Sequence, residues 1–381
     1  MYTHFNTDSC YYPECQNIAI NAHAISNKIS LQSISENQHL KCFLPKQNSQ
    51  YTKKPYFDNI GINEATASYI FCKKHDDIFE KLDTKGIFTV EDIILQTFRS
   101  LAILLNNEKN ALLSTYNYKN WNKPELISIE EVKIYLQRKG YDSLIEHLNN
   151  DEILIAIKKK IIFEVSEHTD SEIITIDNLL KYLEYKLLPQ SNNNQLKDNI
   201  LNTLTTENME YTLLYYITDF QMPVAINSLN KLIIKEKKVN YYITVIPFEN
   251  KTVIIILIPN ELLEFQEIVN KINNFFTTKL TILNFIEAIM ASHDDWYVQP
   301  SIIDNLSEHK RNIFIEDCMF INERRFYNEY DLSIFDKLRT ELCYELNNRN
   351  ELEKVFFIPK RDEYKTRYKK MLEKIVDSSF I

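Results

Sequence analysis

From residue 89 to about residue 190, apolar residues recur at the spacing of amphipathic helices. The segment Thr89-Val90-Glu91-Asp92 has the S/T-x-x-[DE] form of a capping box, and an apolar-periodic run follows it to about Leu105. Ser128–Glu131 repeats this form, and further helices are predicted over about 142–165 and 176–188. Residues 89–208 are therefore expected to form a helical region.

Beyond about Met209 the pattern changes to short β-branched and aromatic runs, which are typical of strands. Strands are predicted over 211–218, 241–246 and 252–258, with a hairpin turn between the last two. The continuous apolar run Val253–Ile258 predicts a strand that is buried on both faces. Helices over about 260–276 and 280–291 would cover it. Residues 209–333 are thus expected to form an α/β region with a small mixed sheet, followed by a C-terminal helical tail over 334–381.

The first 65 residues are polar and contain no long periodic helix. Such a segment buries too little apolar surface to fold by itself, so a metal or another crosslink is expected to hold it. This places a separate module at the N-terminus, over residues 1–88.

Glycine is scarce, with three in 381 residues, whereas an average chain carries about 7%. Gly61, Gly86 and Gly140 are isolated, so no Gly-rich phosphate loop, dinucleotide fingerprint or GxSxG nucleophile elbow is present in the sequence. The reaction classes that depend on these loops are therefore nearly excluded. Because 44% of the residues are hydrophobic, an ordinary globular core is expected.

The formal net charge is −9, which argues against a whole-surface binder of nucleic acid. Residues 360–374 depart from this balance, because seven lysine and arginine residues face three acidic ones there. This segment is either a phosphate-contacting tail or a solvated helix face.

The N-terminal residues have no basic segment followed by an apolar one, so no signal peptide is predicted. The longest strongly apolar run, Val253–Ile258, is far shorter than the ~20 residues that cross a membrane. We therefore expect a cytoplasmic protein without membrane contact.

Four of the six cysteines lie in the first fifth of the chain. In a cytoplasmic protein such clustering indicates a metal site rather than disulfides. Cys10 and Cys15 lie on either side of a short turn that contains Pro13, and Cys72 and His75 are two residues apart. Two short-spaced pairs that are distant in sequence supply the four ligands of a closed zinc site. One pair on a hairpin knuckle, followed by one pair at the start of a helix, predicts a treble clef. The alternative is that Cys10 and Cys15 are unrelated thiols and that His75 caps a helix.

Other polar residues between the two pairs are not needed as zinc ligands. They are His23, Asn37, His39 and Asp76. A histidine, an asparagine and a terminal histidine or aspartate around a treble clef are the arrangement of HNH-type nucleases. In this hypothesis His23 is the general base, Asp76 binds Mg²⁺ or Mn²⁺, and Asn37 or His39 orients the base or contacts phosphate. The alternative is a structural zinc module with His23 buried and hydrogen-bonded.

The chain resembles a broad family of uncharacterised bacterial proteins with an HNH-like treble-clef zinc module. The resemblance rests on the Cys10/Cys15 pair, Ala22-His23, Glu36-Asn37-Gln38-His39 and Phe71-Cys72-Lys73-Lys74-His75-Asp76. Weaker similarity continues through Gln96–Ser100 to Asp295–Ser301. Two positions depart from active HNH nucleases: Ala22 replaces an acidic or histidine metal ligand, and the last position is Asp76 rather than histidine.

The sequence as a whole predicts an α+β protein with an N-terminal treble-clef zinc module. The leading hypothesis is a metal-dependent, HNH-like nuclease that acts on nucleic acid. The resemblance to bacterial proteins adds a role in defence against phage. The alternative is a non-catalytic scaffold, with structural zinc, that recognises nucleic acid or a protein partner.

Overall fold

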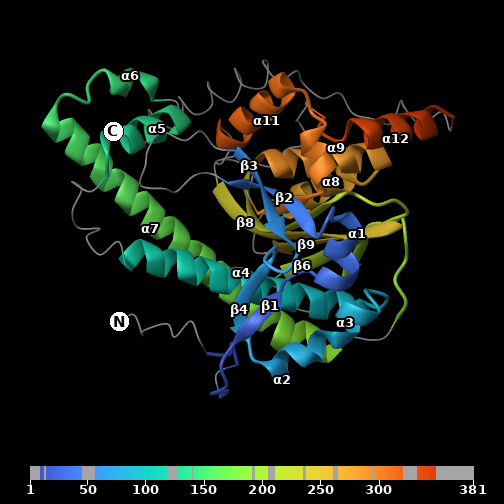
Figure 1. Ribbon diagram of the computed structural model, residues 1–381. Coiled ribbons are helices and arrows are strands. Elements are labelled where there is room, and N and C mark those ends of the chain that lie inside the picture. The colour runs from blue at the N-terminus through green and yellow to red at the C-terminus, as the bar shows by residue number, and fades with distance from the viewer. Residues whose placement is uncertain are drawn as a thin grey trace.

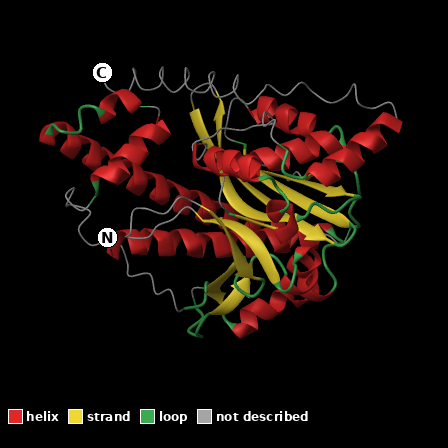
Figure 2. Cartoon of the chain, turned by 45° about the horizontal axis from the view of Figure 1, so that its top comes forward, coloured by secondary structure: helices red, strands yellow, loops and turns green. Residues whose placement is uncertain are grey.

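The computed structural model of the chain describes residues 9–12, 14–44, 56–117, 127–139, 141–190, 194–204, 211–234, 237–260, 265–292, 295–320 and 333–348. Helices lie on both sides of a large central sheet (Figure 1), and the same layers are visible in the turned view of Figure 2. The expected mixture of helix and sheet is confirmed. The basic segment 360–374 lies outside the described residues.

The central sheet has eight strands in the order β3-β2-β10-β7-β8-β9-β6-β5, and all the pairings within it are antiparallel. It is therefore larger than the small mixed sheet that the sequence predicted. The strands predicted over 211–218, 241–246 and 252–258 are confirmed as β6, β8 and β9. The bounds are β2 His39–Leu44, β3 Tyr56–Gly61, β5 Asn202–Leu204, β6 Tyr211–Thr218, β7 Val224–Ile234, β8 Lys237–Phe248, β9 Lys251–Pro259 and β10 Trp296–Val298.

The sheet joins two segments that are distant in the sequence. Strand β2 pairs with β10, with Cys42 opposite Tyr297 and Lys41 opposite Val298. Strand β10 pairs in turn with β7. The two strands β2 and β3 belong to the predicted N-terminal module, yet they extend the sheet of the predicted α/β region. The expected boundary at residue 88 is therefore not a boundary between sheets.

Strand β9 explains why helices cover both faces. Residues Thr252 to Ile258 are all buried. Because successive strand side chains point to opposite faces, Ile254 and Ile256 join one core, and Val253 and Ile255 join the other. The continuous apolar run thus identified a strand buried on both faces, as expected.

One face of the sheet packs against the helices that follow β9. Phe285, Phe314 and Trp296 are fully buried in this layer. The two helices predicted over 260–276 and 280–291 are confirmed as α8 and α9. The helices are α8 Phe265–Phe275, α9 Lys279–Ser292, α10 Pro300–Asp304, α11 Glu308–Phe320 and α12 Asp336–Asn348.

The other face packs against two long helices, α4 (Val90–Asn117) and α7 (Asp151–Tyr182). The capping box at the start of α4 is confirmed: the Asp92 backbone N–H donates to Thr89 Oγ1 at 3.2 Å, and the Thr89 N–H donates to Asp92 Oδ2 at 2.9 Å. Two helices were expected over 142–165 and 176–188, but α7 is continuous through residues 166–175. A short π-helical turn, Leu183–Leu187, and a 3₁₀ turn, Leu188–Gln190, follow it.

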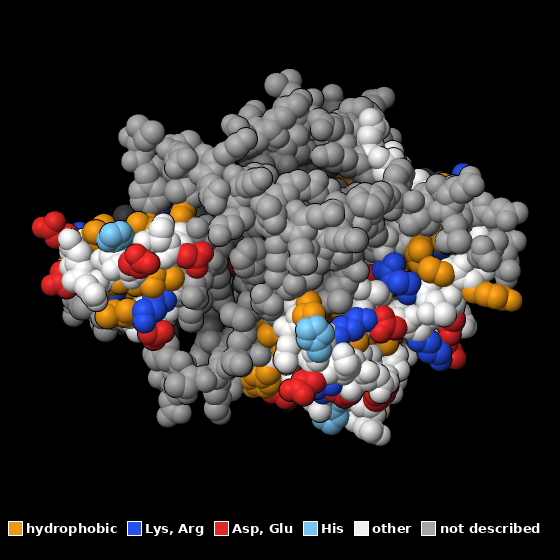
Figure 3. All heavy atoms as spheres, turned by 90° about the horizontal axis from the view of Figure 1, so that it is seen from above, with side chains coloured by type: hydrophobic (Ala, Val, Ile, Leu, Met, Phe, Trp, Pro, Cys, Tyr) orange, Lys and Arg blue, Asp and Glu red, His pale blue; other side chains and the backbone are white. Residues whose placement is uncertain are grey.

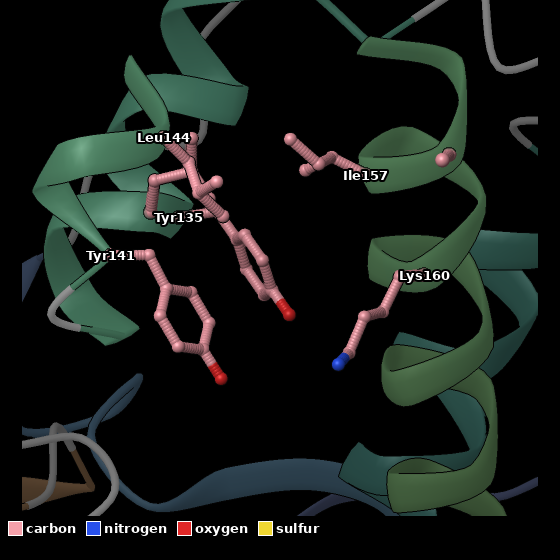
Figure 4. Close-up of a pocket in the computed structure, with 7 residues that line it drawn as sticks. Tyr135, Tyr141, Leu144, Ile157 and Lys160 are labelled. Carbon is pink, nitrogen blue, oxygen red and sulfur yellow. The ribbon is translucent and has the colours of Figure 1, made fainter. Parts of the chain in front are cut away.

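An arm of helices projects beyond the sheet (Figure 1). It contains α5 (Ile129–Lys139), α6 (Asp142–Ile145) and the first turns of α7, with a small core of its own. Tyr135 and Tyr141 lie across a hollow of about 80 Å³ from Lys160 (Figure 4). Ligand pockets typically measure about 300–1,000 Å³, so this hollow is too small for a nucleotide or cofactor. None of the described helices has the length and apolar character needed to cross a membrane.

The elements β1, β4, α2 and α3 lie below the sheet in Figure 1. Strands β1 (Ile20–His23) and β4 (Ala67–Phe71) form a separate antiparallel pair. The chain between them forms a π-helical turn, Asn27–Leu31, the short helix α1 (Gln32–Ile34) and the strands β2 and β3. After β4 come α2 (Lys73–Asp76), a 3₁₀ turn (Asp77–Phe79) and α3 (Glu80–Thr84).

Candidate metal centre and the polar site beside it

The two predicted ligand pairs lie at the same end of the antiparallel β1–β4 strand pair, one before β1 and the other after β4. The turn that carries Cys10 and Cys15 precedes β1, and backbone hydrogen bonds tie it down: Tyr11 N–H donates to Ile70 O at 2.7 Å, and Cys15 N–H donates to Tyr12 O at 2.9 Å. Cys72 follows β4 directly, in an extended conformation that ends the strand and begins α2. Antiparallel pairing therefore brings a pair from residues 10–15 beside a pair from residues 72–75.

The four predicted ligands converge. One donor atom from each lies within 4.8 Å of the others, namely those of Cys10, Cys15, Cys72 and His75. The Sγ atoms of Cys15 and Cys72 are 3.7 Å apart, and the His75 Nδ1 lies 3.1 Å from Cys10 Sγ and 3.5 Å from Cys72 Sγ. Two sulfurs in a tetrahedral site with Zn–S bonds of about 2.3 Å are about 3.8 Å apart. The donor set and its spacing therefore fit a single zinc ion.

The surroundings of Cys72 favour a thiolate. Burial by itself raises the pKa of this thiol, but hydrogen bonding to the backbone of His75 and to the side chains of Cys15 and Asn17 outweighs it, so the pKa of Cys72 is lowered from its usual value. Asn17 Nδ2 lies 3.8 Å from Cys72 Sγ as a donor. At Cys10, by contrast, burial dominates and the pKa is raised. A bound cation would favour the thiolate at both positions.

Aromatic rings pack around this cluster. The Tyr12 ring lies 4.2 Å from the His75 ring, centroid to centroid, and restricts its orientation. Phe71, Phe98 and Phe79 form a stacked and tilted group behind it. Phe98 belongs to α4, so the ligand cluster is packed directly onto the long helix that lies under the large sheet.

His23 is the last residue of β1 and is half-buried. Its Nε2 is enclosed by protein but has no hydrogen-bond partner. Burial lowers the pKa of His23, the positive charge of Arg99 lowers it further, and hydrogen bonding to the backbone of Ile62 and Asn63 only partly offsets this. These effects favour the neutral imidazole of His23. With its ring near backbone groups on one side, Nε2 is the nitrogen left to accept a proton.

Asp76 lies at the end of α2, immediately after His75, one of the four predicted ligands. Its Oδ1 is buried and has no hydrogen-bond partner, although the Arg99 guanidinium lies 3.8 Å away. Burial raises the pKa of this carboxyl, and the nearby charge of Arg99 opposes the effect. Asp76 thus presents an incompletely paired oxygen close to the ligand cluster.

Arg99 lies between the residues of this polar site. Its guanidinium donates to both Asp83 oxygens, at 2.7 and 3.1 Å, and lies over the Phe79 ring at 5.1 Å. Its charge also contributes to the pKa shifts of His23 and Asp76. These four residues, His23, Asp76, Asp83 and Arg99, are called the polar site below.

Asn37 and His39 lie elsewhere, in the turn that leads into β2. Asn37 has a left-handed backbone (φ 51°), and its carbonyl lies 2.7 Å from His39 Nδ1. Both Asn37 and His39 are exposed to solvent. Among the described contacts, no hydrogen bond or ion pair joins either residue to His23 or Asp76. Of the four predicted catalytic residues, His23 and Asp76 are both influenced by the charge of Arg99.

Two members of the polar site, Arg99 and Asp83, were not singled out as site residues from the sequence. Arg99 lies in Gln96–Ser100, a segment that was noted only for its resemblance to bacterial proteins. The sequence offered one signal for Arg99: it is a lone arginine among the core-facing positions of a predicted helix. A buried arginine needs an acidic partner, so such a position indicates a buried ion pair. Asp83 carried no signal, since exposed acidic residues surround it in the sequence.

No family model, curated protein or solved structure matches the chain. The functional argument therefore rests on the geometry of the ligand cluster and the polar site.

Proposed function

We propose that the chain is a zinc-stabilised, HNH-like nuclease that depends on a second, divalent metal ion. The observation that carries the proposal is the placement of two incompletely paired, proton-accepting groups, His23 Nε2 and Asp76 Oδ1, around Arg99 and next to a complete set of zinc ligands. Buried polar atoms without partners are rare and call for an explanation such as a water or an ion.

The proposed zinc has a structural role. Three thiols and one imidazole leave no open coordination position for a substrate, and closed four-ligand sites of this type are structural. The order of a ligand-bearing turn, an antiparallel strand pair and a ligand-bearing helix start supports a treble clef, with residues 24–66 as a long insertion between the two strands.

In the proposed reaction His23 acts as the general base. Its neutral Nε2 takes a proton from water, the water oxygen attacks the phosphorus of the nucleic acid, and the bond from phosphorus to the leaving oxygen breaks. Asp76 would hold Mg²⁺ or Mn²⁺, which supplies positive charge to the phosphate when bound. Asp76 and Asp83 carry two negative charges against the one positive charge of Arg99, so the polar site retains a charge that favours a cation.

A second candidate is a non-catalytic scaffold that binds nucleic acid or a protein partner. The position of Arg99 favours it, because this guanidinium already pairs with Asp83 and lies near Asp76, where a catalytic cation would bind. For this candidate the surface charge favours a protein partner over nucleic acid, because acidic and basic side chains are interspersed over the described part of the face in Figure 3 and the net charge is −9. A bacterial origin, a cytoplasmic location and a role in phage defence rest on the sequence resemblance and its expectations alone.

The deciding experiment incubates the zinc-loaded protein with single- and double-stranded DNA and with RNA, with and without added Mg²⁺ or Mn²⁺. The nuclease proposal predicts metal-dependent cleavage that His23→Ala abolishes and that His147→Ala, an exposed histidine in the helical arm, leaves unchanged. Zinc content is measured in each sample, because a chelator strong enough to remove Mg²⁺ also removes zinc. Cleavage by His23→Ala at the parent rate would exclude His23 as the base. Binding of nucleic acid without turnover would support the scaffold.

A further inference from the structure

The residue after His23 is held unusually firmly. Ala24 is fully buried, and its backbone N–H donates to Thr66 O at 2.9 Å. Its carbonyl oxygen accepts two hydrogen bonds from side chains of α4, one from Gln96 Nε2 at 2.7 Å and one from Ser100 Oγ at 3.0 Å. One hydrogen bond is enough to satisfy a buried carbonyl. The Ala24 oxygen accepts two, so both of its lone pairs are used.

The two donors form one rigid unit on α4. Gln96 and Ser100 are four residues apart, so their side chains lie on the same face of the helix, and Gln96 Nε2 also donates to Ser100 Oγ at 2.8 Å. The exposed fractions of the two residues are 2% and 0%. Neither side chain can be satisfied by bulk water, which makes this arrangement costly to disturb.

The same turn of α4 is fixed to the centre of the large sheet. Asn227 Nδ2 donates to the Ser100 carbonyl at 3.1 Å, and Tyr242 OH donates to Asn227 Oδ1 at 2.9 Å. Tyr242 is fully buried in β8. A continuous chain of contacts therefore runs from the rigid sheet through α4 to the carbonyl of Ala24, the residue that follows His23.

This turn also carries Arg99, whose guanidinium reaches Asp83 and Asp76 in the polar site. The helix thus sets the position of the arginine directly and the position of the histidine through the Ala24 peptide. The Ala24 N–H, which belongs to the peptide joining His23 to Ala24, is held by Thr66 O, and the Ala24 carbonyl is held by α4. Release of the carbonyl would free the backbone torsions of Ala24, which tilt the peptide that joins it to His23 and with it the imidazole ring.

We infer that Gln96 and Ser100 are positioning residues that set the orientation of the His23 imidazole through the backbone carbonyl of Ala24. The inference rests on the proposed function for its catalytic meaning, because only a general base needs such an orientation. The orientation itself can be measured whether or not the protein cleaves nucleic acid.

The test uses Gln96→Leu and Ser100→Ala, with Asn106→Leu as the matched control. Asn106 lies on the same helix, is also buried, and donates from Nδ2 to a different strand carbonyl, Tyr69 O, at 2.8 Å. The tautomer and pKa of His23 are read from ring ¹⁵N and ¹H NMR signals, which are assigned by their loss in His23→Gln. Zinc content and thermal unfolding are measured on the same samples.

The expected result is that both variants keep one zinc and that the signals of His23 change from one fixed tautomer to an averaged one, with the pKa moving toward about 6.5. Asn106→Leu should lower the unfolding temperature and leave the His23 signals unchanged. If cleavage is observed for the parent, both variants should also lose kcat with little change in KM.

Unchanged His23 signals in both variants, with only a lower unfolding temperature, would show that the two residues merely stabilise the fold and would overturn the inference. If Gln96→Leu does not fold, Ser100→Ala decides the matter alone, because it retains the shorter of the two bonds. Absence of cleavage by the parent would count against the proposed nuclease but would leave the NMR result to decide the positioning role.

Discussion

The centre of the sheet and the region around the ligand cluster are held together by different forces. In β9 and its neighbours β6 and β8, buried aliphatic and aromatic side chains fill both faces. The metal-site region, defined here as residues 9–12, 14–23 and 67–84, has two short strands, short helical turns and four convergent ligands. Apolar burial is strong but non-directional, whereas ligands and buried hydrogen bonds fix particular atoms in particular places.

This difference indicates a division of roles. The sheet supplies a rigid base, and the metal-site region, with α4 as its support, supplies chemical groups at fixed positions. Loss of the metal should therefore affect one region far more than the other, and a cavity in the sheet should do the reverse.

The largest expected effect is that of removing zinc with a chelator. Amide hydrogen exchange in β1, β4 and α2 should become at least about a hundredfold faster, which corresponds to a loss of about 3 kcal/mol of local stability. The reason is that structural zinc contributes on the order of 10 kcal/mol to the folding of small zinc modules. Strands β6, β8 and β9 should keep their protection. Equal loss of protection in both regions would contradict the division.

The converse change is Ile256→Ala in the sheet. Ile256 is paired with Leu214 and Ile243 and is 1% exposed. The cavity should lower the free energy of unfolding by about 2–5 kcal/mol, and Ile256→Val by about 0.5–1.5 kcal/mol. Denaturant unfolding measures both. Zinc content should remain that of the parent, and zinc loss from Ile256→Ala would show that the two regions are not separate.

Arg99→Met tests the link between the two regions. It leaves Asp83, about one-fifth exposed, without its partner, and we expect a loss of about 1–3 kcal/mol, reduced by partial solvent access. Lys181→Met, which removes the exposed pair with Asp177, should cost no more than about 1 kcal/mol. An equal cost for the two variants would mean that Arg99 is no more than a surface charge.

The smallest expected effect is that of His23 on the pH dependence of stability. Its pKa is lowered in the folded chain by burial and by Arg99, so the unfolded chain binds a proton more readily. The contribution of His23 is therefore present above its unfolded pKa of about 6.5 and is lost as the pH falls through the lowered value. Thermal unfolding between pH 5 and 7 should vary less in His23→Gln than in the parent.

The comparison must be between those two proteins, because the zinc ligands also take up protons as the pH falls and affect both alike. His147→Gln, an exposed histidine of the arm, should follow the parent curve. Parallel curves for His23→Gln and the parent would remove the electrostatic argument for a neutral base.

Local chemistry in the sequence predicted the ligand cluster and many elements. The four residues of the cluster were singled out one by one, because short spacing and residue type define such a site, and the structure brings their donor atoms together. The capping box at Thr89 and the apolar run Val253–Ile258 were equally local signals, and both are found as expected. Whether the cluster holds zinc in a treble clef remains a prediction.

Features that depend on distant contacts were not predicted. Strand β7 contains Asn227, Ser228 and Asn230, which are polar yet buried. Asn227 is hydrogen-bonded to α4 and to Tyr242 of β8, and Asn230 donates to Ser228 within the strand. The pairing of β2 with β10 joins residues about 250 positions apart, which no periodicity reveals. Arg99 and Asp83 belong to the polar site only because α4 packs on the metal-site region.

The most direct test of the account is the metal content of the purified chain, measured by plasma mass spectrometry beside Cys72→Ser and Cys42→Ser. Cys42 is a buried thiol in β2 outside the ligand cluster. The account predicts one zinc per chain in the parent and in Cys42→Ser, and little or none in Cys72→Ser. A well-folded parent without zinc, or a Cys72→Ser variant that retains it, would contradict the account.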